Sequence, residues 1–445
     1  MAERDLNSSP VRELVRRFLI TFLLGVLIYR LGVFVPIPGV EFRGLQSLVG
    51  EGAGDSPIGA ILAYANMFNG GAIANASVFG LGIMPYISAS IIMQLLTFSF
   101  PALKQLQKEG EGGRRKLNQY TRYATLVICT AQAAMAAYAI FNFTNKEGVP
   151  IVSGGYTRLG FVIQSTLMIT TGSMVLLWLA EQITKFGIGN GVSIIIMIGI
   201  LSAIPGAFTG FDGDLPDYLL IGAVSIAIIA AIVFMVQAVR KINLEQQRRI
   251  QGNKVYGGAS TVLPLKLNQA NVVPVIFASP VMYVLAYAAS LPFIQMEPLF
   301  GASTPGYRYI FAGLIIAFTY FYISITFDLN ELSNHFKQSG FFVRGIKPGK
   351  KTVDFLAFHL KRITFVGAIF LAAIAILPDL IGDRLGGAGA RALMGGTGLL
   401  IVVGVALDVM QKVASFFLAH QYQGLTAGGP GSAAPAAGKK ALKRF

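Results

Sequence analysis

Long apolar stretches alternate with shorter polar connections along almost the whole of this 445-residue chain. About twenty consecutive apolar residues form a helix long enough to cross a hydrocarbon core of about 30 Å. By that criterion the sequence predicts ten membrane-spanning helices. They are expected near residues 18–38, 77–99, 123–143, 161–180, 189–208, 218–239, 271–293, 309–327, 363–377 and 393–418.

Charged residues are distributed unequally between the two alternating sets of connections. The N-terminal segment, the connections near 100–122, 181–188, 240–270 and 328–362, and the C-terminal tail hold 28 Lys and Arg residues against 10 Asp and Glu residues. The five opposite connections hold 6 against 10. Since Lys and Arg accumulate on the cytoplasmic side, this bias predicts that both termini are cytoplasmic and that the number of spans is even.

Composition also favours a membrane protein over a soluble one. Hydrophobic residues make up 54% of the chain and charged residues only 13%, whereas soluble proteins carry about 25% charged residues. The net charge of +15 is interpreted mainly as the topological bias. Large basic loops can also bind anionic lipid headgroups or a cytoplasmic partner. The N-terminal apolar run has no A-x-A-like cleavage site, so it is predicted to be an uncleaved first span.

Signatures of catalysis, metal binding and cofactor binding are scarce. The histidines His335, His359 and His420 form no H-E-x-x-H pattern. The run GIKPGKKT (345–352) departs from the phosphate-binding loop in its glycine spacing and in the position of its threonine. We therefore predict no catalytic residue, no metal site and no cofactor.

Only three ionisable residues fall inside the predicted spans: Arg30, Asp408 and Lys412. Asp408 and Lys412 are four residues apart, which predicts a local ion pair rather than a proton relay. Arg30 lies in the outer half of the first span and is expected to reach the membrane interface or a partner helix.

The second apolar segment, SVFGLGIMPYISASIIMQLLTFSF (77–100), is interrupted near its start by Gly80, Gly82 and Pro85. Membrane helices carry such residues where neighbouring helices, hydroxyl groups or water satisfy the backbone groups that they free. At this point two interpretations are open. The break is either a kink of ordinary packing or an irregular stretch that lines a water-filled cavity.

Several long motifs resemble those of the SecY/Sec61-alpha family, the channel-forming subunits of protein translocases. They are spread across almost the whole chain and follow the order seen in the family. The motifs are PIPG (36–39), NMFNGGAIANASVFGLGIMPYISASIIMQLL (66–96), KEGEGGRRKLNQYTRY (108–123), EQITKFGIGNGVSIII (181–196), LPLKLNQANVVPVIFAS (263–279) and GGTGLLIVV (395–403).

The resemblance implies an all-α integral membrane protein with ten transmembrane helices in two pseudo-symmetric, inverted five-helix halves around an hourglass pore. The N-terminal half would comprise residues 1–210 with spans 1–5, and the C-terminal half residues 211–420 with spans 6–10. Residues 421–445 would form a cytoplasmic tail, and their Ala/Gly/Pro-rich composition predicts disorder.

The resemblance also implies how such a pore is closed. Residues 61–77 would form a re-entrant plug in the outer funnel, and Gly80, Gly82 and Pro85 would mark the joint before the second span. The expected plug residues are Asn66, Met67, Phe68, Gly70 and Gly71. The expected pore ring consists of Ile83, Ile87, Val192, Ile196, Ile276 and Ile401. Each of these six residues is by itself equally compatible with ordinary packing.

A lateral gate between spans 2 and 7 is a further implication. The polar residues Ser88, Gln132 and Asn268 match positions that the family clusters near this seam. Hydrogen bonds among them would hold the seam shut until a signal sequence inserts. Ordinary interhelical hydrogen bonding is the alternative interpretation.

The basic loops 240–270 and 328–362 are where the family binds the SecA motor ATPase or a translating ribosome. The expected contact residues are Arg248, Arg249, Lys254, Arg344, Lys347 and Lys350. Asn253 and Lys347 stand where arginine is expected, and lysine keeps the charge but loses the bidentate geometry. The other partners implied are SecE and SecG helper subunits, secretory and membrane-protein precursors, SecDF and anionic lipids.

The sequence thus predicts a gated, protein-conducting channel of the bacterial inner membrane rather than an enzyme. It would recognise signal sequences, translocate unfolded secretory polypeptides and release apolar segments laterally, driven by an external motor or ribosome. Two alternatives stay open at this stage: a secondary transporter of a small solute, and a membrane scaffold without a pore.

Overall fold

The computed structural model describes most of the chain as helices, with a small sheet at one end. The described residues are 10–41, 66, 68–142, 150–152, 155–209, 215–246, 249–251, 254–256, 260–289, 305–382 and 396–426.

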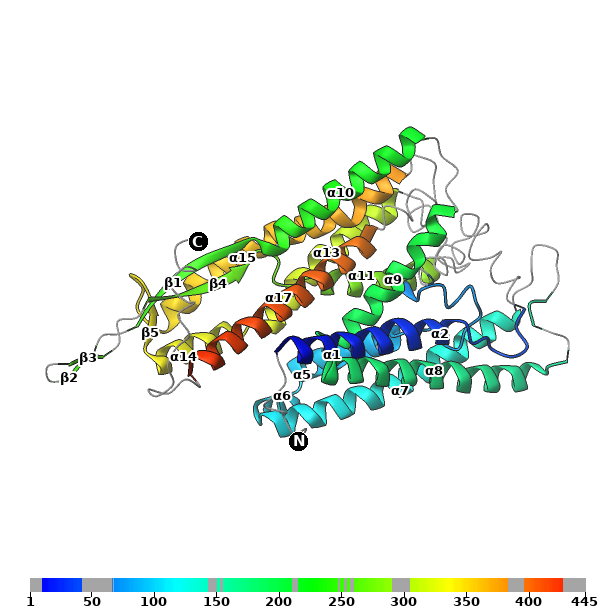
Figure 1. Cartoon of the computed structure of the whole chain (residues 1–445), viewed down its shortest axis with the longest axis horizontal. Helices are drawn as coiled ribbons and strands as arrows, with labels where there is room; N and C mark the ends of the chain where they lie inside the picture. The colour runs from blue at the N-terminus through cyan, green and yellow to red at the C-terminus, as the bar shows by residue number, and fades with distance from the viewer. Residues whose placement is uncertain are drawn as a thin grey trace.

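The first group of helices lies within residues 10–209 and occupies the lower part of Figure 1. It consists of α1 (Pro10–Phe22), the π-helix η1 (Leu23–Ile28), α2 (Tyr29–Val33), α5 (Met84–Ser99), α6 (Pro101–Lys108), α7 (Glu111–Asn142), α8 (Arg158–Phe186) and α9 (Gly191–Thr209). The elements α1, η1 and α2 follow one another directly and together form the first predicted span. Helix α7 packs between α5 and α8.

The second group occupies the upper part of Figure 1 and includes the last described helix. Its helices are α10 (Leu215–Gln237), α11 (Val273–Ala289), α13 (Pro305–Thr326), α14 (Leu329–Ser339), α15 (Lys350–Gly382) and α17 (Gly396–Thr426). Helix α13 packs between α11 and α15, and α17 packs against α10 and α15. Because α17 also contacts α9 and α1, it joins the two groups.

Each of the ten predicted spans falls on a helical segment, and the all-α fold class is confirmed. Six of the described helices are individually long and apolar enough to cross a membrane, and α5 and α6 form a pair bent by 101°. Several helices continue beyond the predicted apolar span: α7 begins at Glu111, α15 at Lys350, and α17 continues to Thr426. Hydropathy reports contact with lipid rather than helicity, so it does not detect these polar turns.

The second span also begins later than predicted. Helix α5 starts at Met84, and the residues before it form turns rather than helix. Gly82 has a φ angle of +57°, which favours glycine, and Pro85 lies in the first helical turn. Proline is accepted there because the N–H that it lacks would have no partner within the helix.

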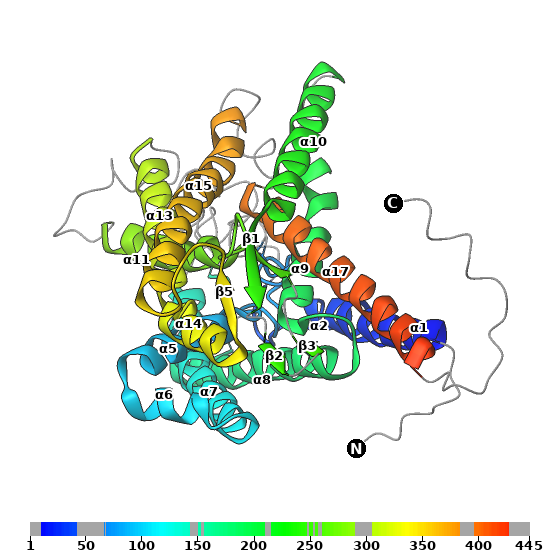
Figure 2. The same cartoon turned by 90° about the vertical axis from the view of Figure 1, so that its left-hand side faces the viewer.

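The two long basic loops meet in one antiparallel sheet (Figure 2). Strands β1 (Val239–Gln246) and β4 (Ser260–Lys266) come from the first loop, and β5 (Phe341–Val343) comes from the second. The strand order is β4-β1-β5. Strands β2 (Arg249–Gln251) and β3 (Lys254–Tyr256) pair with each other in a separate hairpin.

An apolar core holds this sheet against helices of the second group. One face contributes the buried residues Ile242, Leu244, Leu265 and Val343, and α15 contributes Leu356. Side chains of α14 cover the same core. The sheet is therefore a packed structure, and the hydrophobic pattern of the sequence did not predict it.

The first and last described helices have their outer ends on the same side of the molecule. In Figure 1 the start of α1 and the end of α17 both point toward the end that carries the sheet and α14. The guanidinium of Arg17 lies 5.5 Å from the ring centroid of Phe416. This arrangement agrees with an even number of spans.

A tight turn joins α8 to α9, and it has no room for a side chain at Gly187 or Gly191. The hydroxyl of Thr184 accepts a hydrogen bond from Gly191 N at 2.8 Å, and that of Thr21 accepts one from Ile188 N at 3.0 Å. A Cβ atom at Gly191 would collide with the carbonyl oxygen of Ala180.

We expect Gly191→Ala to destabilise the protein, by about 1–3 kcal/mol, because the added methyl group forces backbone to move. Gly222→Ala is the matched control, since a Cβ at Gly222 on α10 would meet no atom within 4 Å. Thermal inactivation in detergent measures both variants. Equal stability of the two would contradict the close approach of α8 and α9.

Candidate functional site

Four helices from both groups bring the six predicted ring residues into one hydrophobic cluster. Ile83 and Ile87 lie at the start of α5, Val192 and Ile196 on α9, Ile276 on α11, and Ile401 on α17. Ile83, Ile196 and Ile401 are buried, and the other three are partly buried against them. The six ring side chains themselves carry no hydrogen-bonding group.

Ile83 lies just outside the helix that carries Ile87. Ile83 is the residue before the first turn of α5 and has a φ of −98° and a ψ of 3°. Its carbonyl oxygen still accepts a hydrogen bond from Ile87 N at 3.2 Å. The two side chains therefore keep a one-turn spacing although only Ile87 is within the helix.

Residues 66 and 68–82, called here the plug segment, comprise the described part of the predicted plug (61–77) and the predicted joint before α5. They are built mainly of turns, with many of their backbone groups bonded inside the segment. The Asn66 side chain accepts a hydrogen bond from Ala74 N at 2.9 Å, and the Asn69 amide donates to the Gly80 carbonyl oxygen at 2.8 Å. Of the predicted plug residues, Met67 lies outside the described part of the chain, as do residues 61–65.

The backbone at Gly82, in the predicted joint, packs directly against Asn69. Asn69 is buried, and a Cβ atom at Gly82 would collide with its Oδ1 atom. Gly82 therefore needs to be glycine both for its backbone angle and for its contact with Asn69.

The three predicted gate residues come from different elements of the two groups. Ser88 is on α5, Gln132 on α7, and Asn268 precedes α11. Asn268 is buried and donates to the carbonyl oxygen of Asn271 at 3.2 Å. Within the described residues no hydrogen bond links the three side chains, so their role stays a prediction.

The predicted basic contact residues lie on or beside the sheet. Arg344 follows β5, and its Nε atom is 3.5 Å from a carboxylate oxygen of Glu245 on β1. Lys347 lies in the turn before α15 and Lys350 is the first residue of that helix; both are exposed. The hairpin strands carry Arg249 and Lys254, whereas Arg248 and Asn253 lie outside the described residues.

The charges inside the spans have local partners. Lys412 Nζ lies 2.9 Å from Asp408 Oδ2, which confirms the predicted ion pair. Arg30 was expected to reach the interface or a partner helix. Instead its Nη1 atom donates to the carbonyl oxygen of Gly70, in the plug segment, at 3.0 Å.

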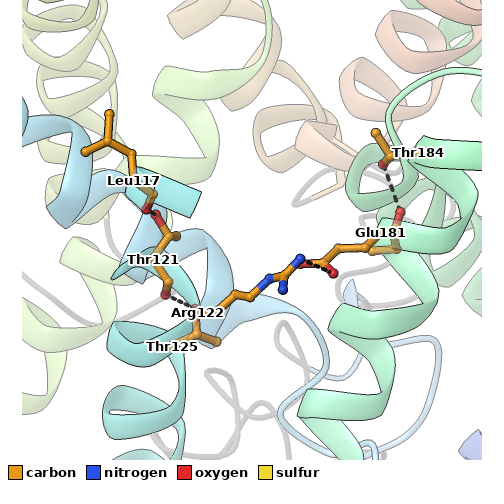
Figure 3. A network of polar contacts seen from close by, with 7 residues as sticks. Leu117, Thr121, Arg122, Thr125, Glu181 and Thr184 are labelled. Atoms are coloured by element: carbon orange, nitrogen blue, oxygen red, sulfur yellow. Dashed lines mark hydrogen bonds and ion pairs between the residues drawn. The ribbon is translucent and has the colours of Figure 1, made fainter. Parts of the chain in front are cut away.

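The most strongly bonded ion pair of the described residues was not anticipated. Arg122 on α7 donates two hydrogen bonds of 2.6 Å to the carboxylate of Glu181 on α8 (Figure 3). Hydroxyls of Thr121, Thr125 and Thr184 bond to carbonyl oxygens of their own helices nearby. Arg122 and Glu181 were both predicted to lie in loops. A signal for this pair was present in the sequence. The third and fourth predicted spans are consecutive and antiparallel, and they carry opposite charges at the two ends that lie side by side.

Comparison with protein families and curated relatives gives a consistent result. The SecY family model matches residues 77–410. The protein translocase subunit SecY of Thermotoga maritima is 37% identical over 423 residues, which cover 94% of this chain and 96% of the relative. The subunit of the same name from Escherichia coli K12 is 39% identical over 435 residues, with 92% and 93% covered.

Solved structures share the fold at lower sequence identity. One described as a protein-conducting channel is similar with a TM-score of 0.60 and 19% identity, covering 92% of this chain and 94% of that chain. Sec61 in a canine ribosome–channel complex from the endoplasmic reticulum is similar with a TM-score of 0.57, 18% identity and the same coverage.

The bidentate ion pair generates a prediction for helix packing. We expect Arg122→Gln and Glu181→Gln each to lower stability, and the double variant to lose less than the sum of the two. The coupling energy should be about 1 kcal/mol, since both side chains are partly exposed. Thermal unfolding of the four proteins measures it.

The pair formed by Arg115 and Glu111, at 3.6 Å and almost fully exposed, is the control and should show no measurable coupling. Equal coupling in the two cycles would mean that the bidentate geometry does not matter.

Proposed function

Since this chain belongs to the SecY family, we propose that it is the channel subunit of a protein translocase and conducts unfolded polypeptides across a membrane. The chain is a multi-pass membrane protein with the fold of solved SecY and Sec61 channels. The observation that supports the proposal most directly is the aliphatic cluster, because its members come from four helices of both groups and lie close to the plug segment.

In this proposal the six aliphatic side chains form the constriction of an hourglass pore. A collar without hydrogen-bonding groups gives a passing polypeptide little to bind, and when closed it resists water and ions by dewetting. The plug segment covers the collar in the resting state. The packing of Phe68 and Phe79 against the same cluster supports this role.

We further propose that the channel opens sideways between α5 and α11 and sorts segments by hydrophobicity. Each Leu, Ile, Phe or Val gains roughly 0.3–0.6 kcal/mol at the bilayer centre, whereas Lys, Arg or Asp costs roughly 2.5–3.5 kcal/mol. Summed over a signal sequence, this difference in free energy decides whether the segment enters the lipid or passes through the pore. Helix α5 packs on α7, and α11 packs on α13, so the two helices flanking the proposed seam belong to different groups.

The sheet end is proposed as the cytoplasmic docking surface for a ribosome or the SecA motor. Its exposed Lys347 and Lys350 support this assignment, as does the canine relative, which was solved in a ribosome–channel complex. SecE and SecG are the proposed helper subunits. On this assignment both termini are cytoplasmic, in a bacterial inner membrane.

Intramembrane charge supports a channel over a solute transporter. Asp408 and Lys412 neutralise each other, and Arg30 is bonded to a backbone carbonyl. Among the described spans these side chains form no chain of ionisable groups of the kind that relays protons in transporters.

The collar yields one prediction for gating. Replacing Ile276 or Ile401 with asparagine puts an amide into an apolar cluster, which costs about 1–3 kcal/mol in the closed state. Both variants should raise resting ion leak and export precursors with defective signal sequences. Ile276→Leu and Ile401→Val are the controls and should behave as wild type. Unchanged leak and unchanged signal stringency in both asparagine variants would argue against the collar.

The docking surface yields a second prediction. Lys347→Glu should slow ATP-driven export in reconstituted vesicles by reversing a charge on the proposed motor surface, while the channel still inserts normally. Lys116→Glu, an equally exposed change on α7, should have a smaller effect. Normal export kinetics in the Lys347 variant would remove this turn from the motor site.

A further inference from the structure

We propose that Arg30 is a latch that holds the plug segment closed in the resting channel. Its hydrogen bond to the Gly70 carbonyl oxygen ties this part of the segment to the first span. The inference rests on the proposed function, because a latch has a role only if the plug segment closes a pore.

The plug segment has a fixed base. Three hydrogen bonds attach this base to the end of α2 and the residues that follow it. They run from Ile37 N to Ala76 O at 2.8 Å, from Val78 N to Val35 O at 3.0 Å, and from Ser77 Oγ to Gly32 O at 2.9 Å. The base therefore stays with the first span when the other end moves.

The opposite end, around Gly70, is attached differently. The Arg30 guanidinium donates to the Gly70 carbonyl oxygen at 3.0 Å and lies 5.1 Å from the ring centroid of Phe34. No carboxylate among the described residues forms an ion pair with Arg30. Its hydrogen-bond partner is thus the neutral carbonyl group of a segment that can leave. A charged residue inside a membrane span usually has a functional role.

A socket on α9 fits Gly70 closely. Gly70 has a φ of +62°, and a Cβ atom there would lie 2.6 Å from Ser202 Oγ and 3.0 Å from Tyr29 Oη. At Gly199 a Cβ atom would lie 2.5 Å from the carbonyl oxygen of Phe68. The two glycines let the backbone of the segment lie directly on α9, where Arg30 can reach it.

The segment between base and socket is bonded to itself, so it can leave as a unit. Gly71 N donates to Asn66 O at 2.9 Å, and Ser77 N donates to Ala72 O at 2.8 Å. Release therefore requires that the hydrogen bonds from Arg30 to Gly70 and from Asn69 to Gly80 break and that Phe68 and Ala72 leave the aliphatic cluster. In the open state water in the funnel solvates the guanidinium, which makes the latch reversible.

Resting ion leak of reconstituted channel complexes in liposomes tests the latch. Arg30→Gln should raise the leak about tenfold, because a hydrogen bond to a charged group is lost. Arg30→Lys should restore part of the closure, which a merely structural role would not produce. Gly199→Ala keeps the arginine but displaces the segment, so it should leak as well.

Arg158→Gln is the matched control. Arg158 also stacks on an aromatic ring, that of Tyr138, and donates to Asn142, but it lies at the start of α8. This variant should leak as little as wild type. Wild-type leak in Arg30→Gln would overturn the latch. If Arg30→Gln does not fold, the leak of Arg30→Lys decides in its place: the latch requires a value above that of wild type.

Failure of the proposed function is separable from failure of the latch. A channel should show ion conductance that rises when a translocating precursor is added to wild-type complexes. If no precursor-dependent conductance occurs in wild type or in any variant, the channel assignment itself fails. If it occurs normally while Arg30→Gln stays tight at rest, only the latch is wrong.

Discussion

Backbone N–H and C=O groups inside a bilayer must find partners within the protein, and this constraint shapes the whole molecule. Helices satisfy it by themselves, which is why long helical segments account for almost all of the described spans. The plug segment is the main exception. Its turns are satisfied by side chains that replace the missing helical bonds, notably those of Asn66, Asn69 and Ser77.

Close backbone contact is the second consequence of the same constraint. Where an irregular segment lies against a helix, side chains between them would separate the polar groups from their partners. The contacts at Gly199 on α9 and Gly172 on α8 show this, because a Cβ atom at either position would collide with or crowd a carbonyl oxygen of the plug segment. At these two contacts even a methyl group is too large.

The sequence predicts the ten spans well because each depends on a local property, its contact with lipid. Features that depend on distant parts of the chain are less accessible. The pairing of β1 with β5 joins residues about a hundred positions apart, and the loops show no strand-like alternation strong enough to reveal it. Arg122 and Glu181 likewise meet only because two helices pack at one register. The candidate site was found through family resemblance, since isoleucines such as Ile276 and Ile401 look like any other apolar residue in a span.

The sheet has a mechanical consequence. Strand β1 continues almost directly from α10, β4 leads into α11, and β5 is followed by α15. Antiparallel hydrogen bonds and a shared apolar core join these three strands into one rigid sheet that connects the helices. A force applied to either loop is therefore distributed over α10, α11 and α15. These three helices would move together rather than bend at one flexible connection.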